Sequence, residues 1–156
     1  MSAKRREANL EAAIVAALDA GGMRKIIVAG QEYPIAIRAT WMDDAAGGTG
    51  EVAAEAEPVE YPAIIIDASG AHAEDERDGP AWVIPVRITV ETWNQDDKKL
   101  RGGIAIYEEL RGILEAEGLT MAVGNFDALT IDDGGEWLII GGANTIMIQA
   151  HANMHD

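Results

Sequence analysis

The most constraining feature of the sequence is the stretch IPVRITVETWNQDDKKL at residues 84–100, which changes from one periodicity to another within a few residues. Apolar side chains recur at every second position from Ile84 to Val90, and this period of two predicts a strand with one face in the core. A helix is predicted to follow, because Asn94 or Asp96 can cap its first turn. The junction carries acids where a bound phosphate would lie, which disfavours a nucleotide site.

The helix predicted after this strand has an apolar side and a side of small residues. Its apolar stripe runs through Leu100, Gly103, Ile104, Tyr107, Leu110 and Leu114, and Gly118 ends it. The other side presents a line of Gly102, Ala105, Gly112 and Ala116. A glycine inside an exposed helix costs roughly 1 kcal/mol relative to alanine. The line therefore indicates that another element approaches this side closely.

Apolar periodicity also predicts the elements that precede residue 84. An Ala-rich amphipathic helix has Leu10, Ile14 and Leu18 at intervals of four, and two glycines stop it. The run YPAIIIDAS is short and continuously apolar, which is typical of a strand covered on both faces. The predicted elements are a helix at 4–20 ended by Gly21 and Gly22, strands at 24–29 and 35–41 joined as a hairpin by a turn region from Gly30 to Pro34, and a strand at 61–69.

Two acid-rich segments interrupt these elements, and the end of the chain is rich in strand signals. Residues 42–60 and 70–81 contain little that could be buried, so they are predicted to be mobile loops. The predicted C-terminal strands lie at 119–131, at 136–140 and after 144, with turns at 132–135 and 141–144. The element order predicts one α+β domain over residues 1–156, with a mostly antiparallel sheet, two helices packed on one face and long acidic loops.

Composition narrows the classes of function. The chain has 27 acidic residues against 12 Lys and Arg, a formal charge of −15, which argues against gripping a phosphate backbone. It has no Cys, so disulfides and thiolate chemistry are excluded. No apolar run approaches the roughly 20 residues that a bilayer-spanning helix needs, and the N-terminus lacks a signal-peptide core. We expect a soluble protein, made in a cytoplasm and not bound to a membrane.

No motif predicts a catalytic, cofactor or metal site. His72 lies among four acids, but their order is not that of a calcium loop, and such runs are usually solvated. His151 and His155 lie near the C-terminus without the glutamate of a zinc-protease motif, and a frayed tail explains them better. The GGTG at 47–50 lacks the Lys of a phosphate-binding loop. Neither serine, Ser2 or Ser69, lies in a nucleophile elbow.

The outer face of the strand at 84–93 is the best candidate for a contact surface. Arg87, Thr89, Glu91 and Trp93 alternate with its apolar residues, so they lie on the face away from the core. A large amphipathic ring on a polar face often belongs to an interface, and Trp93 has two interpretations on this basis. It contacts another subunit, or it is sheltered by a neighbouring loop of its own chain.

Five features occur in order over roughly residues 5–150: the Ala-rich first helix, YPAIIID, the strand VRITVETWNQ, the helix with IYEELRGIL and a terminal β segment. Together they resemble the tail terminator proteins of long-tailed bacteriophages. The resemblance implies an α+β virion protein, assembled in the host cytoplasm. Such proteins form a ring, typically a homo-hexamer, that caps the tail tube and helps join it to the neck or connector. It implies no catalytic residues, and DNA that passes through the ring without being bound.

This resemblance gives the small-residue and outer-face side chains a role. The predicted subunit interface is Arg87, Glu91, Trp93, Gly102, Ala105, Gly112 and Ala116, and the predicted tube or neck contact is Trp41, Asp43, Asp44 and Glu51. The strand pair at 24–41 and the loop after it depart from the family, so another neck or tail ring or adaptor protein stays open. Two alternatives are a cation-dependent enzyme around Trp93, Asn94, Asp96 and 70–78, and a binding module that uses the loop at 42–60.

Overall fold

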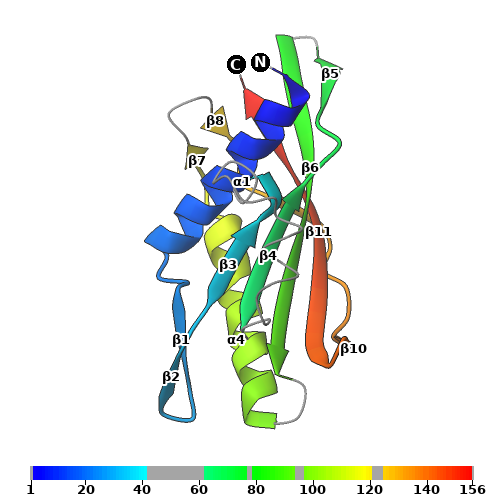
Figure 1. The fold of residues 1–156 in the computed structure, drawn as a ribbon. Coiled ribbons are helices and arrows are strands. Elements are labelled where there is room, and N and C mark those ends of the chain that lie inside the picture. Colours follow the sequence, from blue (N-terminus) through cyan, green and yellow to red (C-terminus); the bar gives the residue numbers. More distant parts are fainter. Residues whose placement is uncertain (1, 42–61, 77–78, 94–96, 121–124, 156) are drawn as a thin grey trace.

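The computed structural model describes residues 2–41, 62–76, 79–93, 97–120 and 125–155. Two helices and a curled, mostly antiparallel sheet make up this part of the chain, so the predicted α+β class is confirmed (Figure 1). The elements are α1 (Ala3–Ala20), β1 (Lys25–Val28), β2 (Gln31–Pro34), β3 (Ala36–Ala39), β4 (Ala63–Ala68), β5 (His72–Glu76), β6 (Gly79–Trp93), α4 (Asp97–Leu114), β7 (Leu119–Thr120), β8 (Asn125–Phe126), β9 (Thr130–Asp133), β10 (Leu138–Ile140) and β11 (Ala143–His155).

The two longest strands, β6 and β11, form the centre of the sheet. They are antiparallel and paired without a break from Ala81 opposite His155 to Trp93 opposite Ala143. The alternation predicted from Ile84 to Val90 is confirmed, because the even-numbered side chains of β6 from Ile84 to Val90 are buried. Their partners on β11 alternate in the same way, which places one apolar face of both strands in the core.

Shorter strands flank this central pair on both sides. β4 runs antiparallel to β6, and β3 lies parallel to β4 at that edge of the sheet. The other edge of β11 is lined in turn by β10, β9 and β8, and β7 pairs with β8. The turn between β10 and β11 is Gly141–Gly142, both at positive φ (57° and 82°), which is the geometry of a two-residue hairpin turn.

The sequence prediction for residues 70–81 is wrong. These residues were expected to form a mobile loop, but β5 pairs antiparallel with the first residues of β6, from His72 opposite Val83 to Glu76 opposite Gly79. The extra hairpin stands at the end of the molecule near both chain termini (Figure 1). Its strand was missed because backbone pairing holds it, while its exposed side chains, such as His72 and Glu74, carry no apolar period.

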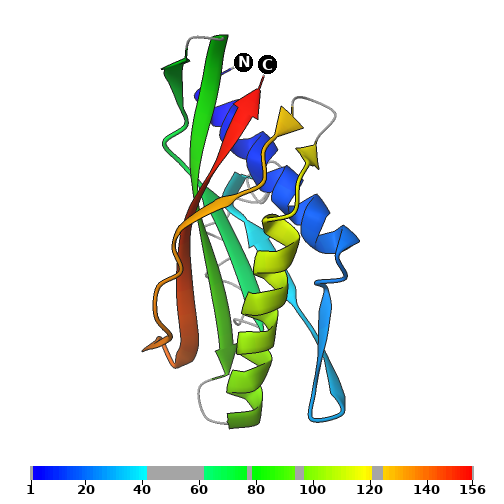
Figure 2. The same ribbon diagram turned by 180° about the vertical axis from the view of Figure 1, so that it is seen from behind.

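The predicted pairing of residues 24–29 with 35–41 is also wrong. Ala29 and Gly30 make the turn, both at positive φ (53° and 80°), and β2 occupies the region expected to be the turn. Residues 36–39 instead leave the hairpin and enter the main sheet as β3. Among the described residues, β1 and β2 form a two-stranded sheet of their own, which extends from the body of the domain (Figures 1 and 2).

Both helices contribute to one hydrophobic core. Leu10, Ile14 and Leu18 of α1 are fully buried, as predicted. α1 contacts α4, β3 and β4, and α4 contacts β6 and β1. The predicted stripe of α4 needs a correction, because Ile104 is 38% exposed while Ile106 is completely buried. The core side of α4 consists of Gly103, Ile106, Leu110 and Leu114. The side chain of Leu100, also part of the predicted stripe, lies outside the described part of the structure.

Within the described part of the chain, no helix is both long and apolar enough to cross a membrane. α1 carries Arg6, Glu7 and Glu11 on its buried side, and α4 carries several charges on its exposed side.

Candidate interaction surface

Two buried acids of α1 hold the ends of strands β3 and β4. Glu11 is fully buried, and its carboxylate accepts hydrogen bonds from the backbone N–H of Trp41 (2.7 Å) and of Ala68 (2.9 Å). One turn earlier, Glu7 accepts from the N–H of Ala71 (3.1 Å). Each bond satisfies a backbone donor at or just beyond the end of a strand, so the acids tie α1 to the sheet.

The environment of Glu11 changes its acidity. Burial raises the pKa of its carboxyl to about 7, although the N–H donors of Ala68 and Trp41 oppose the shift. The nearby carboxylates of Asp67 and Glu7 add to the rise in pKa. A perturbed carboxyl is often a mark of an active site, but this one has no exposed surface for a substrate to reach. Its position favours a structural function.

The indole of Trp41, a residue of the predicted tube or neck contact, is hydrogen-bonded within its own chain, and the contact stays a prediction. The indole Nε1 donates to the carbonyl of Ala68 (3.1 Å), and the ring is half-buried. The backbone of Trp41 is held by Glu11 at the same place. The other three residues of that prediction, Asp43, Asp44 and Glu51, lie outside the described residues.

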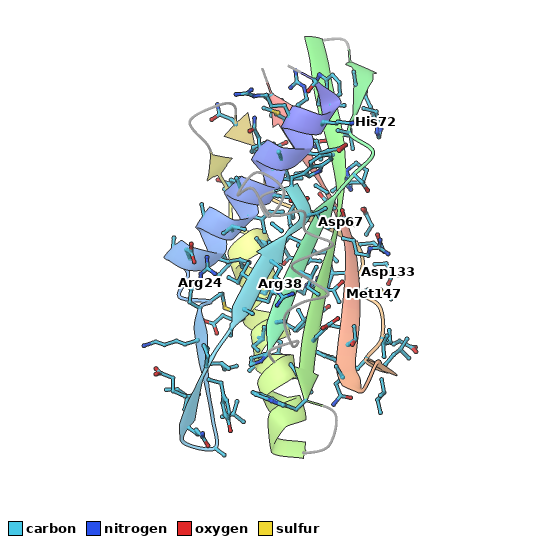
Figure 3. All side chains as sticks on the ribbon, in the orientation of Figure 1. Arg24, Arg38, Asp67, His72, Asp133 and Met147 are labelled. Atoms are coloured by element: carbon cyan, nitrogen blue, oxygen red, sulfur yellow. The ribbon has the colours of Figure 1, made fainter. Side chains whose placement is uncertain are left out.

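The outer face of the sheet is partly engaged within the chain. The guanidinium of Arg87 lies 3.7 Å from the carboxylate of Asp67, and both side chains are about half-exposed. Burial raises the pKa of Glu91, and the charge of Arg38 opposes that rise. In Figure 3, Arg38 and Asp67 lie on the neighbouring strands β3 and β4. Arg87 and Glu91 remain accessible, but each has a charged neighbour of its own chain.

Trp93 follows the second of its two interpretations. Its ring lies edge-on against Tyr33, with 4.6 Å between the ring centroids, and the residue is half-buried. The shelter comes from β2, a strand rather than the loop that the sequence suggested. The ring of Trp137 also lies edge-on against a tyrosine, Tyr107, with 6.4 Å between the ring centroids. Both indoles thus pack within the chain, and Trp93 is a weaker candidate for a subunit contact than expected.

The line of small residues on α4 divides into two parts. Gly102 is buried against β1, where an added Cβ would lie 2.7 Å from Cγ2 of Val28. The neighbouring Gly103 is packed as closely against Thr92, at 2.8 Å. The close approach predicted for this side is therefore made at Gly102 by the chain's own hairpin, which removes Gly102 from the predicted subunit interface. Ala105 and Gly112 are exposed and remain in it, as does Ala116, which lies beyond the helix because α4 ends at Leu114 and not at Gly118.

Two alanine substitutions on α4 should have opposite effects. Gly112→Ala is expected to raise the free energy of unfolding by about 0.5 to 1 kcal/mol, because nothing lies within 4 Å of the added Cβ and alanine favours the helix. Gly102→Ala is expected to lower it by about 1 kcal/mol, because the clash with Val28 outweighs that gain. Urea unfolding of both variants measures the difference. If Gly102→Ala and Gly112→Ala stabilise the protein equally, Val28 of the hairpin does not pack closely against α4 at Gly102.

The histidines near the C-terminus are not in a frayed tail. β11 continues to His155, whose Nε2 lies 3.0 Å from a carboxylate oxygen of Asp127. His151 lies on the same face of the strand, 2.9 Å from Asp132 of β9. Each is a pair of one histidine and one aspartate, and in the part of the chain that the structure describes no three potential ligands cluster as a metal site would require.

The strand predicted at 136–140 is present as β10, but its exposure was not predicted. Leu138, Ile139 and Ile140 of β10 are 51%, 64% and 48% exposed, and Met147 beside them is 37% exposed. The run of three apolar residues is typical of a buried strand, yet in the described structure β10 pairs with β11 alone. We call Leu138, Ile139, Ile140 and Met147 the β10 edge. Its signal in the sequence is the pair of glycine turns that isolate so short a strand.

A second exposed apolar side chain lies on the other flank of the molecule. Ile27 of the β1–β2 hairpin is 68% exposed, and that hairpin and β10 stand on opposite sides in both ribbon views (Figures 1 and 2). Figure 3 places Arg24 on the hairpin flank, and Asp133 and Met147 on the flank of β10. An exposed apolar strand with a free edge is a surface that natural proteins usually cover or charge.

No known protein-family profile matches the chain, and no curated protein sequence matches it. The candidate surfaces are therefore inferred from the structure alone, that is, from side-chain exposure and strand pairing. They are the β10 edge, the hairpin with Ile27, and the exposed small residues Ala105 and Gly112 of α4 with Ala116 just after it. All three are candidate surfaces for contacts with protein, and the buried acids of α1 hold strand ends of the domain that carries them.

Proposed function

We propose that this chain is a structural virion protein of a long-tailed bacteriophage. It assembles with copies of itself into a ring, a hexamer by the resemblance, that caps the tail tube and helps join the tail to the head. The observation that carries this proposal is the pair of exposed apolar segments, the β10 edge and Ile27, on opposite flanks of a small domain. Two different exposed apolar surfaces on opposite flanks suit a subunit that contacts one neighbour on each side.

The elements that carry the resemblance support the same function. The Ala-rich helix is α1, the phrase AIIID lies in β4, VRITVETW lies in β6 and IYEELRGIL lies in α4. Buried residues of all four elements belong to one hydrophobic core cluster. The β1–β2 hairpin, which departs from the family, projects from that domain, so a different ring or adaptor of the neck or tail is the second candidate.

The charge of the chain suits a passage for DNA. Six copies at −15 each carry roughly ninety negative charges, which repel phosphates rather than bind them. The same charge opposes assembly, so the contacts between copies must be apolar or must match acids with cations. The β10 edge supplies apolar area for such a contact.

Mass measurement of the purified protein, alone and after mixing with tail tubes of the same phage, tests the proposal. We expect a closed oligomer, either in the protein alone or on the tube end, and sedimentation of the protein with the tubes. Tubes that already carry their native cap are the matched control, and they should take up no further protein. A strict monomer that stays in the supernatant with uncapped tubes would contradict the function. Binding to the isolated connector but not to tubes would favour the second candidate.

A further inference from the structure

We propose that a second copy of this chain covers the β10 edge, and that the part of the copy that covers it is the β1–β2 hairpin. This assigns the two surfaces of a head-to-tail contact, and it rests on the self-assembly in the proposed function. The contact joins one flank of a subunit to the opposite flank of the next. The exposed segments Leu138–Ile140 and Ile27 are its apolar centre.

The backbone donors and acceptors along the β10 edge favour a strand as its partner. β10 pairs with β11 through one edge, and in the described residues no strand pairs with the other. Backbone donors and acceptors on a free edge are satisfied by an added strand. Successive side chains point to opposite faces, so Leu138 and Ile140 lie on one face and Ile139 on the other. All three are exposed, and a strand added at the edge contacts both faces at once.

The β1–β2 hairpin has the properties of such a partner. It forms a two-stranded sheet apart from the main one among the described residues, and an isolated hairpin of this size gains little stability from its own pairing. It is held to its own chain by Val28 against Gly102 and by Tyr33 against Trp93. Ile27 faces outward, 68% exposed, and is available to another chain.

Charge favours the hairpin over a second β10 edge. The segment 130–142 contains Asp132, Asp133 and Glu136 with no Lys or Arg, and no Lys or Arg follows Arg111 anywhere in the chain. Two β10 edges brought together would therefore place six acids at one contact, which is repulsive.

The hairpin flank is much less acidic than the β10 edge. Segment 24–34 contains Arg24 and Lys25 against one acid, Glu32. Lys25 is 3.3 Å from Glu32, and Arg24 forms an ion pair with Asp19, so these cations offset acids of their own chain and leave the flank near neutral. An acidic edge meets less repulsion there than against a copy of itself.

The position of the two segments decides the symmetry of the contact. Because the hairpin and the β10 edge lie on opposite flanks, one contact leaves a free hairpin at one end of the pair and a free edge at the other. Such heterologous contacts continue until the rotation between neighbours closes a ring. A symmetric dimer through β10 would instead stop at two copies.

Two complementary variants test this arrangement. Ile27→Asp disrupts the hairpin side of the contact, and Ile139→Asp disrupts the β10 side. Each adds one negative charge at an exposed position. We expect each variant alone to be monomeric by native mass spectrometry, with self-affinity reduced about a hundredfold or more relative to the wild type. An equimolar mixture should form a one-to-one heterodimer, because the intact edge of one variant meets the intact hairpin of the other. Asn125→Asp, on β8 at the other end of the sheet, is the charge-matched control and should assemble like the wild type.

The alternative outcomes are distinct. Dimers of Ile27→Asp alone would overturn the inference in favour of symmetric pairing through β10. Assembly of both variants like the wild type would also overturn it, and would leave the ring of the proposed function with a contact elsewhere. A wild type that stays monomeric in solution and on tail tubes would overturn both. Thermal melts within a few degrees of the wild type would confirm that the exposed substitutions leave the fold intact.

Discussion

Replacing Glu11 by Ala is expected to lower the free energy of unfolding by about 3 to 5 kcal/mol. The substitution leaves the N–H donors of Trp41 and Ala68 without their acceptor, next to a space that the carboxyl filled. Ala68 is 99% buried, since only 1% of it is exposed, so water cannot replace the lost bond there without entering the core. Urea unfolding at neutral pH, followed by circular dichroism, measures the loss.

Two control variants show whether the loss of stability in Glu11→Ala comes from the buried hydrogen bonds. Glu108→Ala removes an exposed acid from α4 and should change stability by less than about 0.5 kcal/mol, which shows that a lost carboxylate alone is harmless. Glu7→Ala removes one hydrogen bond instead of two and should fall between the other variants. A loss below about 1 kcal/mol for Glu11→Ala would show that α1 and the strand ends are held by apolar packing alone.

The position of Glu11 shows how far the sequence could predict the fold. The apolar residues Leu10, Ile14 and Leu18 predicted the helix and its buried side correctly, because helical periodicity depends on local spacing. Glu7 and Glu11 lie four apart along the same side, and an acid beside an apolar stripe indicates a buried partner. The partner could not be predicted, since Trp41 and Ala68 reach Glu11 only through the folded sheet.

The strands that the sequence missed share one cause. β2 and β5 are held by backbone pairing, and their side chains, such as Glu32 and His72, are polar and exposed, so no alternation reveals them. The strand at 136–140 that contains β10 was predicted, but its exposure was not. Its three apolar residues predict a strand, but whether a strand is covered depends on which elements reach it in the fold. The exposure of the candidate interaction surface and the pairing of β6 with β11 thus needed the structure, while the strands β6 and β11 themselves did not.

The stability of this chain is expected to increase as pH falls from about 8 to about 5. In the folded protein the pKa of Glu11 is about 7, above its ordinary value of 4.5, so between these values the folded state binds a proton that the unfolded state has released. Unfolding then releases that proton, and the contribution of Glu11 to stability is lost as pH rises through 7. A shift of this size corresponds to about 3 kcal/mol across the window.

The variant Glu11→Gln isolates this contribution, because it keeps every other titrating group. The carboxylates that face Glu11, Glu7 on its own helix and Asp67 on β4, remain, as do the His–Asp pairs of β11 and the net repulsion of an acidic chain. The pKa of Asp19 is lowered by its hydrogen bond with Arg24, and this acts below pH 4, outside the window. We therefore expect the increase in unfolding free energy from pH 8 to pH 5 to be smaller in Glu11→Gln by about 2 to 3 kcal/mol. Equal slopes in the two proteins would mean that Glu11 stays ionised throughout, with its two N–H donors outweighing the cost of burial.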